Sequence, residues 1–322
     1  MLNNKQLINS LRPNKFCDFI GQKEIIDSLK IFVEAIKKRG FPNDHLLLYG
    51  PPGTGKTTLA YLIANELHTQ TKITTGAALT KTGDLAAILT SLKDNEIFFI
   101  DEIHRLPKPV EEMLYSVLED YHLDIVIGKG PSARIINLSI PKILIIGSTT
   151  KLAVISAPLR DRFGLTLRLN YYQEEEIMKI VYQAAKKINL PVSEKAAHEI
   201  AIRSRKIPRV ALKILKRAKD LYDVKKIKVI DESFIDNLFG ILKMNPLGLN
   251  PIDLEYLEVL YKKFNNQPVG LSTIAVSLSE EEKTIEEFIE PYLLRLGLIK
   301  KTPKGRVLTQ KGLSYLGQIK LL

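Results

Sequence analysis

Hydrophobic residues in the first half of the chain form short continuous runs that are separated by amphipathic helical stretches. The clearest runs lie at residues 45–49 (HLLLY), 97–100 (IFFI) and 142–146 (KILII), and a weaker one lies near residues 72–75. A continuous apolar run is typical of a strand that is buried on both faces of a parallel sheet. The alternation of runs and helical stretches therefore predicts an α/β domain with helices on both faces of that sheet.

The pattern changes at residues 124–140, where hydrophobic and polar residues alternate on either side of the sequence GKGP. Alternation with a period of two, broken by glycine and proline, predicts a β-hairpin. We therefore expect a hairpin to be inserted between two elements of the core. The residues alone leave open whether this hairpin extends a sheet or binds a partner.

From about residue 173 the hydrophobic pattern takes a helical period. It predicts four helices, at residues 174–188, 193–204, 208–221 and 231–239. Ser193 and Asp231 stand where N-cap residues belong, and Pro208 suits a first helical turn.

A linker is predicted at residues 244–251, because two prolines and a glycine interrupt the helical pattern there. Beyond the linker we expect helices at residues 252–264 and 272–278, and another ending near residue 296 that Pro291 kinks or divides. Two strands, at residues 298–300 and 307–309, should then flank a basic loop at residues 301–306. Three helices followed by two strands is the order of a winged-helix domain.

The composition is that of an ordinary globular protein with an excess of basic residues. Hydrophobic residues make up 45% and charged residues 26%, and 47 Lys and Arg face 36 Asp and Glu, a formal charge of +11. The single cysteine, Cys17, excludes an internal disulfide and a multi-cysteine zinc site. With no signal peptide or membrane-spanning stretch, we expect a cytoplasmic protein without a membrane partner. The positive charge favours polyanionic partners.

Basic charge is concentrated at the C-terminus. From Pro291 to the end there are seven basic residues and no acidic one, whereas an acidic block lies just before, at residues 280–290. This separation can place opposite charges on different surfaces of one small domain. It indicates a nucleic-acid contact in that domain more directly than the total charge does.

A phosphate-binding loop is the strongest motif. The sequence GPPGTGKT begins at Gly50, follows the apolar run at 45–49 and opens an apolar helix. Gly50, Gly53 and Gly55 let backbone amides point at the phosphates, and the positive end of the helix reinforces the anion site. Lys56 would reach the β- and γ-phosphates, and the Thr57 hydroxyl would bind Mg²⁺. The motif predicts ATP and Mg²⁺ as cofactors.

Asp101 and Glu102 supply the second half of a hydrolysis site, because they end the apolar run at residues 97–100. Asp101 would organise the metal, and Glu102 would orient the attacking water. Acidic residues are common at strand ends, so the pair means little alone. Downstream of a phosphate loop it indicates ATP hydrolysis.

Three further segments resemble the AAA+ ATPases. Thr149 and Thr150 stand where that class has a polar sensor of the γ-phosphate, and the sequence does not choose between them. Arg162 resembles the arginine finger that reaches a neighbouring subunit's γ-phosphate, although a surface salt bridge with Asp161 would be ordinary. Arg209 resembles the second sensor at the start of a lid helix, where a solvated basic helix face is the alternative.

Longer strings narrow the resemblance to the RuvB family of bacterial Holliday-junction branch-migration ATPases. The strings LRP, FIGQ, GPPGTGKTTLA, DEIHRL, LEDY, SAPLRDRFG, YYQ and KTPKGR occur in the family's order between residues 11 and 306. DEIHRL, LEDY and TPKGR are far more specific than the phosphate loop. The resemblance implies an AAA+ ATPase domain at residues 1–170, a helical lid at 171–245 and a winged-helix DNA-binding domain at 246–322.

The resemblance also implies ligand contacts. Leu11 and Arg12 would flank the adenine, and Tyr172 with Arg209 would close over the nucleotide from the lid. Further contacts with the nucleotide are implied for Thr58, Glu119, Asp120 and Tyr121.

The DNA contacts implied by the resemblance are Lys301, Lys304 and Arg306. The family usually has Arg at the positions of Lys301 and Lys304, and Lys keeps the charge but loses the planar two-donor fork. Contacts with phosphates survive that change, and a motor that moves along any sequence needs no others.

The partners implied by the resemblance are double-stranded DNA at four-way junctions, RuvA on the hairpin at 124–140, and RuvC in a resolvase complex. The subunits would form a hexameric ring. The main alternative is a clamp-loader or initiator relative that uses ATP as a binding switch on DNA. A protein-unfolding ATPase would need an aromatic pore loop, and residues 75–93 contain no aromatic residue. A winged-helix regulator would have little need of Glu102.

Overall fold

The computed structural model describes residues 11–127, 134–225 and 227–319. The chain forms two compact units, whose boundaries along the sequence fall at 189/190, 205/206 and 213/214. Within the described ranges no helix is long and apolar enough to cross a membrane.

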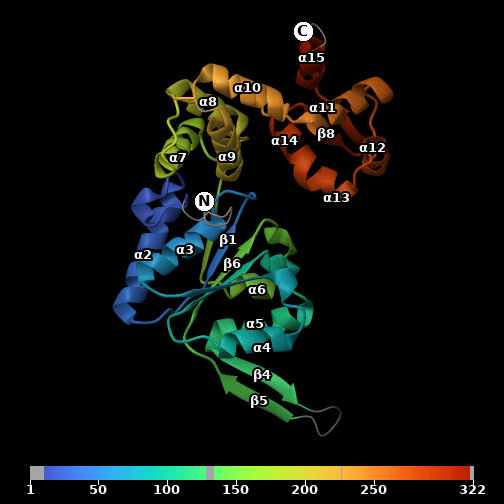
Figure 1. Ribbon diagram of the computed structural model, residues 1–322. Helices are drawn as coiled ribbons and strands as arrows, with labels where there is room; N and C mark the ends of the chain where they lie inside the picture. Colours follow the sequence, from blue (N-terminus) through green and yellow to red (C-terminus); the bar gives the residue numbers. More distant parts are fainter. Residues whose placement is uncertain (1–10, 128–133, 226, 320–322) are drawn as a thin grey trace. The chain divides into compact units, whose positions relative to one another are not determined.

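The first unit is built on a five-stranded parallel sheet in the order β2-β3-β6-β1-β7 (Figure 1). The strands are β1 (Leu46–Tyr49), β2 (Thr71–Thr75), β3 (Ile97–Asp101), β6 (Leu144–Thr149) and β7 (Leu165–Arg168). The predicted parallel α/β sheet is confirmed. The edge strand β7 was not predicted, because its LTLR sequence alternates between apolar and polar residues and forms no apolar run.

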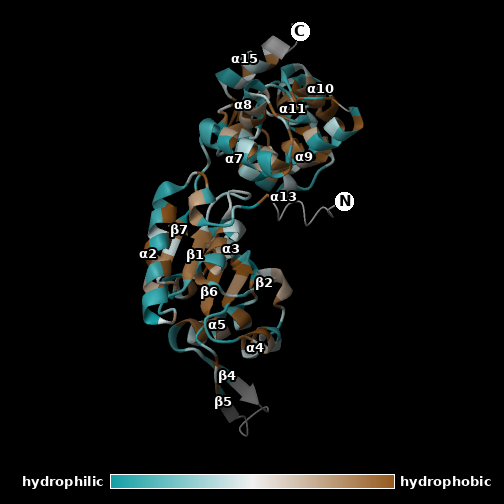
Figure 2. Ribbon diagram, turned by 60° about the vertical axis from the view of Figure 1, so that its left-hand side comes forward, coloured by the Kyte–Doolittle hydropathy of each residue, from teal (hydrophilic) through white to brown (hydrophobic). Residues whose placement is uncertain are grey.

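Side chains of the central strands alternate between two hydrophobic clusters. Leu46 and Leu48 face one cluster with α2 (Lys23–Arg39) and α3 (Lys56–Leu67), whereas Leu47 faces the other. The second cluster is covered by three helices, α4 (Thr82–Thr90), α5 (Lys108–Asp120) and α6 (Ala157–Asp161). The strands are therefore apolar on both faces, as their brown colour in Figure 2 shows.

The predicted hairpin is present between α5 and β6. Its strands, β4 (His122–Ile127) and β5 (Arg134–Ser139), form an antiparallel sheet that is separate from the five-stranded one (Figure 1). The predicted turn at residues 128–131 lies outside the described residues. The hairpin is not an extension of the core sheet, and its Ile136 and Leu138 are exposed.

The predicted lid helices are present as α7 (Glu174–Lys187), α8 (Glu194–Arg203), α9 (Pro208–Lys225) and α10 (Glu232–Leu242). Ser193 accepts a hydrogen bond from the amide of Ala196 at 3.2 Å, and Asp231 accepts one from Phe234 at 2.9 Å. Both predicted N-caps are confirmed, and Pro208 opens α9 as predicted.

The C-terminal part of the second unit has its own hydrophobic core. Its helices are α11 (Pro251–Glu258) with a π-helical continuation Val259–Lys263, α12 (Leu271–Leu278), α13 (Glu282–Thr284) with the π-helical Ile285–Ile289, α14 (Glu290–Arg295) and α15 (Gln310–Ile319). Pro291 lies in the first turn of α14 and divides the helical stretch as expected, since its ring removes a backbone N–H.

The predicted extent of the basic loop was wrong. Strands β8 (Ile299–Thr302) and β9 (Gly305–Leu308) pair Lys301 with Arg306, so that only residues 303 and 304 form the turn. Gly305 has a φ of +136°, and a Cβ there would lie 2.3 Å from the Val269 carbonyl oxygen. Val269 forms an antiparallel bridge with Arg306 of β9. That pairing partner lies far back in the chain, which a local sequence pattern does not show.

Candidate nucleotide-binding site

The phosphate loop begins where β1 ends and needs glycine for close approach. A Cβ on Gly50 would lie 2.2 Å from the Leu169 carbonyl oxygen. At Gly53 a Cβ would lie 2.8 Å from the Cβ of Arg209, a residue in the first turn of α9. The two glycines let the loop pass directly under neighbouring backbone and under the start of a lid helix.

Lys56 is a buried cation at the first position of α3. Its Nζ donates hydrogen bonds to the carbonyl oxygens of Gly50 and Pro51, both at 2.9 Å. Burial lowers the pKa of Lys56, Asp101 opposes that shift and Arg209 adds to it, and together they bring the pKa to about 8. A phosphate at this position would therefore meet a desolvated ammonium group, whose attraction for it is strong.

Asp101 ends β3, and its Oδ1 accepts hydrogen bonds from the Ser148 hydroxyl and from the Glu102 amide at 3.1 Å. Both bonds end on Oδ1, which leaves Oδ2 for a metal ion or a water molecule bound to it. The arrangement fits the Mg²⁺ role that the sequence predicts, in which the metal also binds the Thr57 hydroxyl and the phosphates.

Glu102 directly follows the last residue of β3 and has a left-handed φ of +50°. The carboxylate is half exposed and pairs with Arg105 at 3.0 Å. Glu102 is thus accessible at the carboxyl edge of the sheet.

The two candidate sensor residues differ in their surroundings. Thr149 is buried, and its hydroxyl contacts Nδ1 of His104 at 2.9 Å and accepts a hydrogen bond from the Lys151 amide at 2.9 Å. Thr150 is exposed just beyond the end of β6. The Thr149 hydroxyl is therefore already engaged, whereas that of Thr150 is accessible to a ligand.

Tyr172 and Arg209 both approach the phosphate loop. The Tyr172 side chain is only 2% exposed, and its hydroxyl donates to the Thr54 carbonyl at 2.9 Å. The Arg209 amide donates to the Gly53 carbonyl at 3.3 Å. The structure thus brings together the two lid residues that the sequence assigned to nucleotide binding.

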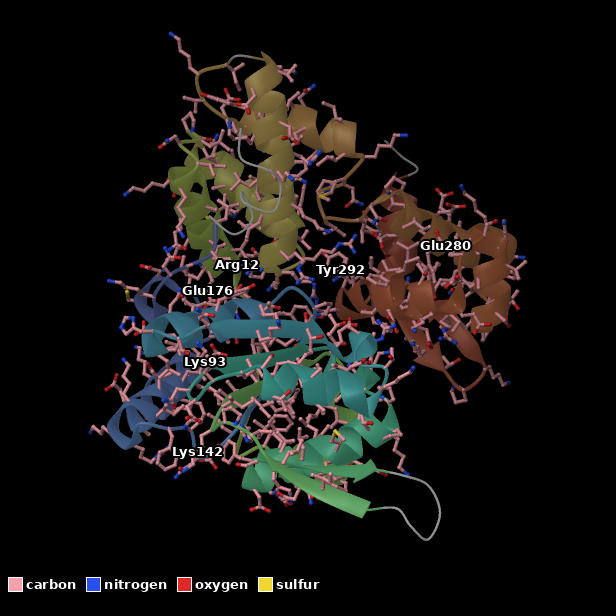
Figure 3. All side chains as sticks on the ribbon, turned by 60° about the horizontal axis from the view of Figure 1, so that its bottom comes forward. Arg12, Lys93, Lys142, Glu176, Glu280 and Tyr292 are labelled. Atoms are coloured by element: carbon pink, nitrogen blue, oxygen red, sulfur yellow. The ribbon has the colours of Figure 1, made fainter. Side chains whose placement is uncertain are left out.

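The residues predicted to flank the adenine lie in the same unit. Leu11 is buried, and the guanidinium carbon of Arg12, which is labelled in Figure 3, lies 4.6 Å from the centroid of the Tyr61 ring. The Arg12 carbonyl accepts a hydrogen bond from Lys187 of α7. Thr58 lies beside Thr57 in the first turn of α3.

Arg162 is held against α5, at the end of α6. Its Nε forms an ion pair with Glu119 at 3.0 Å, and its guanidinium carbon lies 4.5 Å from the Tyr115 ring centroid. Asp161 pairs instead with Arg160, at 3.6 Å. The alternative of a salt bridge between Arg162 and Asp161 is therefore wrong.

Asp120 and Tyr121, which the resemblance also assigned to nucleotide contacts, differ in their surroundings. Asp120 is exposed at the end of α5. Tyr121 packs within its own domain, where its hydroxyl donates to the Pro42 carbonyl at 2.7 Å and its ring meets His45 edge-on. The Tyr121 hydroxyl therefore has an intramolecular partner.

Two of the three predicted DNA contacts form ion pairs with a buried carboxylate. Glu290 is fully buried, and it binds Lys301 at 2.6 Å and Arg306 at 2.8 Å. The Tyr256 hydroxyl donates to the same carboxylate at 3.0 Å. Arg306 is only 16% exposed, whereas Lys304 is exposed in the turn.

The structure adds residues that the sequence analysis missed. Ser148, His104 and Arg105 contact Asp101, Thr149 and Glu102 respectively. His104 and Arg105 belong to the DEIHRL string, which carries the family resemblance but does not by itself indicate these contacts. Glu290 was counted only as part of the acidic block, and no local signal marks it as the buried member.

A parallel sheet with a phosphate loop, an adjacent Asp-Glu pair and a lid residue on that loop defines an ATPase of the AAA+ class. Family models match along the chain as the Holliday junction DNA helicase RuvB P-loop domain at residues 11–169, the RuvB AAA lid domain at 172–245 and the RuvB C-terminal winged helix domain at 246–317. The chain belongs to the RuvB family.

Individual relatives agree with the family models over nearly the whole chain. The Holliday junction branch migration complex subunit RuvB of Campylobacter hominis is 51% identical over 313 residues, 97% of this chain and 92% of the relative. The protein of that name from Ehrlichia ruminantium is 48% identical over 309 residues, 96% of this chain and 93% of the relative. The solved RuvB Holliday junction branch migration motor of Thermotoga maritima is 40% identical, with a TM-score of 0.84 over 96% of this chain and 98% of that one.

Nucleotide binding should take up a proton at alkaline pH. The pKa of Lys56 is lowered to about 8, and a bound phosphate should raise it again. Above pH 8 the binding of ATP should therefore recruit up to about one proton per site, and affinity should fall as the pH rises. Calorimetry at pH 8.5 in buffers of different ionisation enthalpy measures the uptake, and Lys56→Met should abolish it. Equal uptake in both proteins would contradict the assignment.

Glu290→Gln should destabilise the winged-helix domain, because it leaves Arg306 without its buried partner. Burial alone would raise the pKa of Glu290, but Arg306 and Lys301 outweigh it and the pKa lies below its usual value. The ion pairs therefore stabilise the domain above about pH 4.5 and do so less as the pH falls. We expect a loss of about 3 kcal/mol at pH 7 that shrinks below pH 4.5, measured by denaturant unfolding. Glu286→Gln, at a half-exposed site, is the control and should cost far less.

Proposed function

We propose that this protein is an ATP-hydrolysing motor that drives the branch migration of four-way DNA junctions. The observation that carries the proposal is the meeting of Lys56, Asp101 and Glu102 at one edge of the sheet, in a chain that also carries a winged-helix domain. The relatives named above are branch-migration subunits, and the match to them covers nearly the whole chain. We further propose ATPase, lid and winged-helix domains at residues 1–170, 171–245 and 246–322, in a cytoplasmic protein.

The hydrolysis site uses residues of two segments, the phosphate loop with the start of α3 and the end of β3. Lys56 and the amides that begin at Gly50 bind the β- and γ-phosphates, while Thr57 and Asp101 hold Mg²⁺, which neutralises charge on the phosphates. Glu102 orients the attacking water from the carboxyl edge of the sheet. Its ion pair with Arg105 holds the carboxylate near that position.

Thr150 is the better candidate for the γ-phosphate sensor, because it is exposed beyond the strand end while the Thr149 hydroxyl is engaged with His104. Thr149 then serves to position the DEIHRL segment. Arg209 and Tyr172 bind the nucleotide from the lid side, supported by their contacts with the phosphate loop. Leu11 and Arg12 flank the adenine.

The working assembly is a ring of subunits, in which Arg162 completes the neighbouring subunit's site. Among the described residues its contacts are with α5 and with the Pro158 carbonyl, and none is with the phosphate loop. The Arg162 side chain is 26% exposed, and it would leave its ion pair with Glu119 to reach an adjacent molecule. Glu119 and Asp120, which are exposed beside it, contribute to the same contact. A hexamer is the ring size we propose.

The partners are duplex DNA, RuvA and RuvC. We assign RuvA to the hairpin, because the hairpin lies outside the core sheet and exposes Ile136 and Leu138. We assign the DNA contacts to the exposed lysines of the wing, Lys300 and Lys304. Lys301 contributes from its half-exposed position. Arg306 chiefly holds the wing in shape through Glu290.

Glu102→Gln tests the function. With RuvA and ATP, the parent protein should convert a synthetic four-way junction with homologous arms into duplex products. The variant should bind ATP as the parent does but turn it over at least a hundredfold more slowly, because it lacks the group that orients water. Junction conversion should then stop. Normal turnover in the variant, or a parent that hydrolyses ATP without converting junctions, would contradict the proposal.

Mixing experiments test the shared site. Arg162→Ala subunits should bind ATP and hydrolyse it at least a thousandfold more slowly, as expected when a finger arginine is lost. Adding Lys56→Ala subunits should restore part of the turnover, because some interfaces then combine an intact loop with an intact finger. Arg160→Ala, two residues away, is the control and should hydrolyse ATP normally. No recovery in confirmed mixed rings would exclude a finger that acts between subunits.

A further inference from the structure

The connection between α8 and α9 holds two consecutive residues in an uncommon conformation. Arg205 and Lys206 both have a φ of +59°, in the left-handed region that residues other than glycine rarely occupy. Such a conformation persists only where the surroundings hold it in place. One of the three sequence boundaries between the two compact units falls at the bond between these residues.

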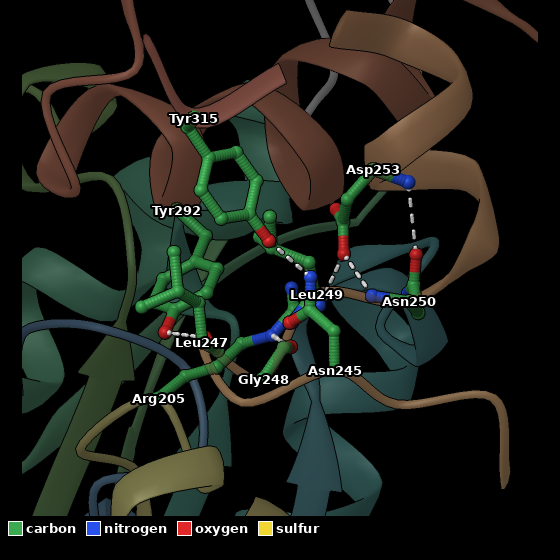
Figure 4. Close-up of polar contacts among 9 residues, drawn as sticks. All are labelled: Arg205, Asn245, Leu247, Gly248, Leu249, Asn250, Asp253, Tyr292 and Tyr315. Carbon is green, nitrogen blue, oxygen red and sulfur yellow. Dashed lines mark hydrogen bonds and ion pairs between the residues drawn. The ribbon is translucent and has the colours of Figure 1, made fainter. Parts of the chain in front are cut away.

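The Arg205 side chain binds residues of the winged-helix domain. Its Nε donates to the Gly248 carbonyl at 3.0 Å, and its Nη2 forms an ion pair with Asp253 of α11 (Figure 4). Its guanidinium carbon also lies 4.5 Å from the Tyr292 ring centroid. Arg205 is 15% exposed and Asp253 only 1%, so the pair is shielded from water and from screening by salt.

The Arg205 backbone is held from the same domain. Arg295 of α14 donates a hydrogen bond to the Arg205 carbonyl at 2.6 Å. Tyr292, whose ring both arginines contact, donates from its hydroxyl to the Leu247 carbonyl at 2.6 Å. Contacts at both the backbone and the side chain fix Arg205 to residues of the linker and of α14.

The residues that follow Arg205 contact the nucleotide site instead, through backbone hydrogen bonds and close packing. The Lys206 carbonyl accepts a hydrogen bond from the Tyr172 amide at 3.1 Å. A Cβ on Gly53 would lie 2.9 Å from the Ile207 side chain, and the Arg209 amide bonds to the Gly53 carbonyl. One short connection therefore carries the nucleotide contacts on one side and the winged-helix contacts on the other.

We propose that Arg205, through Asp253 and Tyr292, is a positioning residue that links the state of the nucleotide to the DNA-binding domain. This inference rests on the proposed function and deepens it. When the phosphate loop moves the Lys206–Arg209 segment, Arg205 must move with it, and the winged-helix domain follows. A flexible contact would absorb the movement, whereas a planar guanidinium fixed by a carboxylate, a carbonyl and an aromatic ring transmits it.

The test measures thermodynamic coupling between nucleotide and DNA. For the parent, the dissociation constant for duplex DNA is measured with ADP and with the β,γ-imido analogue of ATP. The two constants should differ by about fivefold or more if the sites are coupled. In the double variant Arg205→Met with Asp253→Asn, the ratio should fall to within about twofold of one.

The double substitution is chosen to preserve folding. It removes both charges together and leaves no unpaired buried ion. The Asp253→Asn change also keeps a side-chain oxygen at this position, which can still accept the hydrogen bond that Asp253 accepts from the Asn250 amide. Arg205→Lys keeps a cation beside Asp253 but loses the fork and the stacking, so it should lower the ratio partway.

A matched control is available in the same unit. The exposed pair of Lys195 with Glu232, at 2.9 Å, links α8 to α10, and Lys195→Met with Glu232→Gln should keep the parent's ratio. Basal ATP turnover without DNA should stay within about twofold of the parent in all variants, since the nucleotide contacts are intact.

The possible outcomes distinguish a failure of the role of Arg205 from a failure of the proposed function. A folded double variant and a folded Arg205→Lys that both keep the parent's ratio would overturn the role of Arg205. A parent whose DNA affinity is the same with both nucleotides would count against the proposed function and would remove the coupling with it. Loss of the ratio in the control pair as well would also overturn the inference, because any change in the lid would then suffice.

Discussion

The contact between the phosphate loop and the start of α9 is the constraint on which the nucleotide site depends. The Arg209 amide bonds to the Gly53 carbonyl, and a side chain at position 53 would collide with Arg209. The Tyr172 hydroxyl, bonded to the Thr54 carbonyl, adds a second tie to the same loop. Three separate parts of the chain, the loop, Tyr172 and the α9 terminus, are therefore joined by hydrogen bonds to backbone carbonyls. A change in the loop cannot stay local.

The sequence predicted most of the fold because its signals are local. Continuous apolar runs marked β1, β3 and β6, and Ser193 and Asp231 capped the helices that they were expected to cap. The failures share a physical cause, which is dependence on a distant partner. β7 is an edge strand whose only neighbour in the described sheet is β1, and β9 is fixed by Val269. Neither pairing can be recognised from the sequence of the strand itself.

The residues of the site likewise fall into those that the local sequence predicts and those that it does not. Loop glycines, Lys56 and the Asp-Glu pair follow from motif and context, and the structure brings them to one edge of the sheet. The roles of charged residues outside motifs did not follow, because charge type does not tell which side chain is buried. Glu290 lies in a run of glutamates yet is the one at 0% exposure, and it decides how Lys301 and Arg306 behave.

The buried carboxylate also sets what evolution can change in the wing. Lys301 contacts Glu290 through a single nitrogen, so position 301 requires only a positive charge of suitable length. Either lysine or arginine meets this requirement. Arg306 contacts Glu290 through both Nε and Nη2 and Glu286 through Nη2, a geometry that lysine lacks. Position 301 should therefore tolerate either lysine or arginine, whereas position 306 should require arginine.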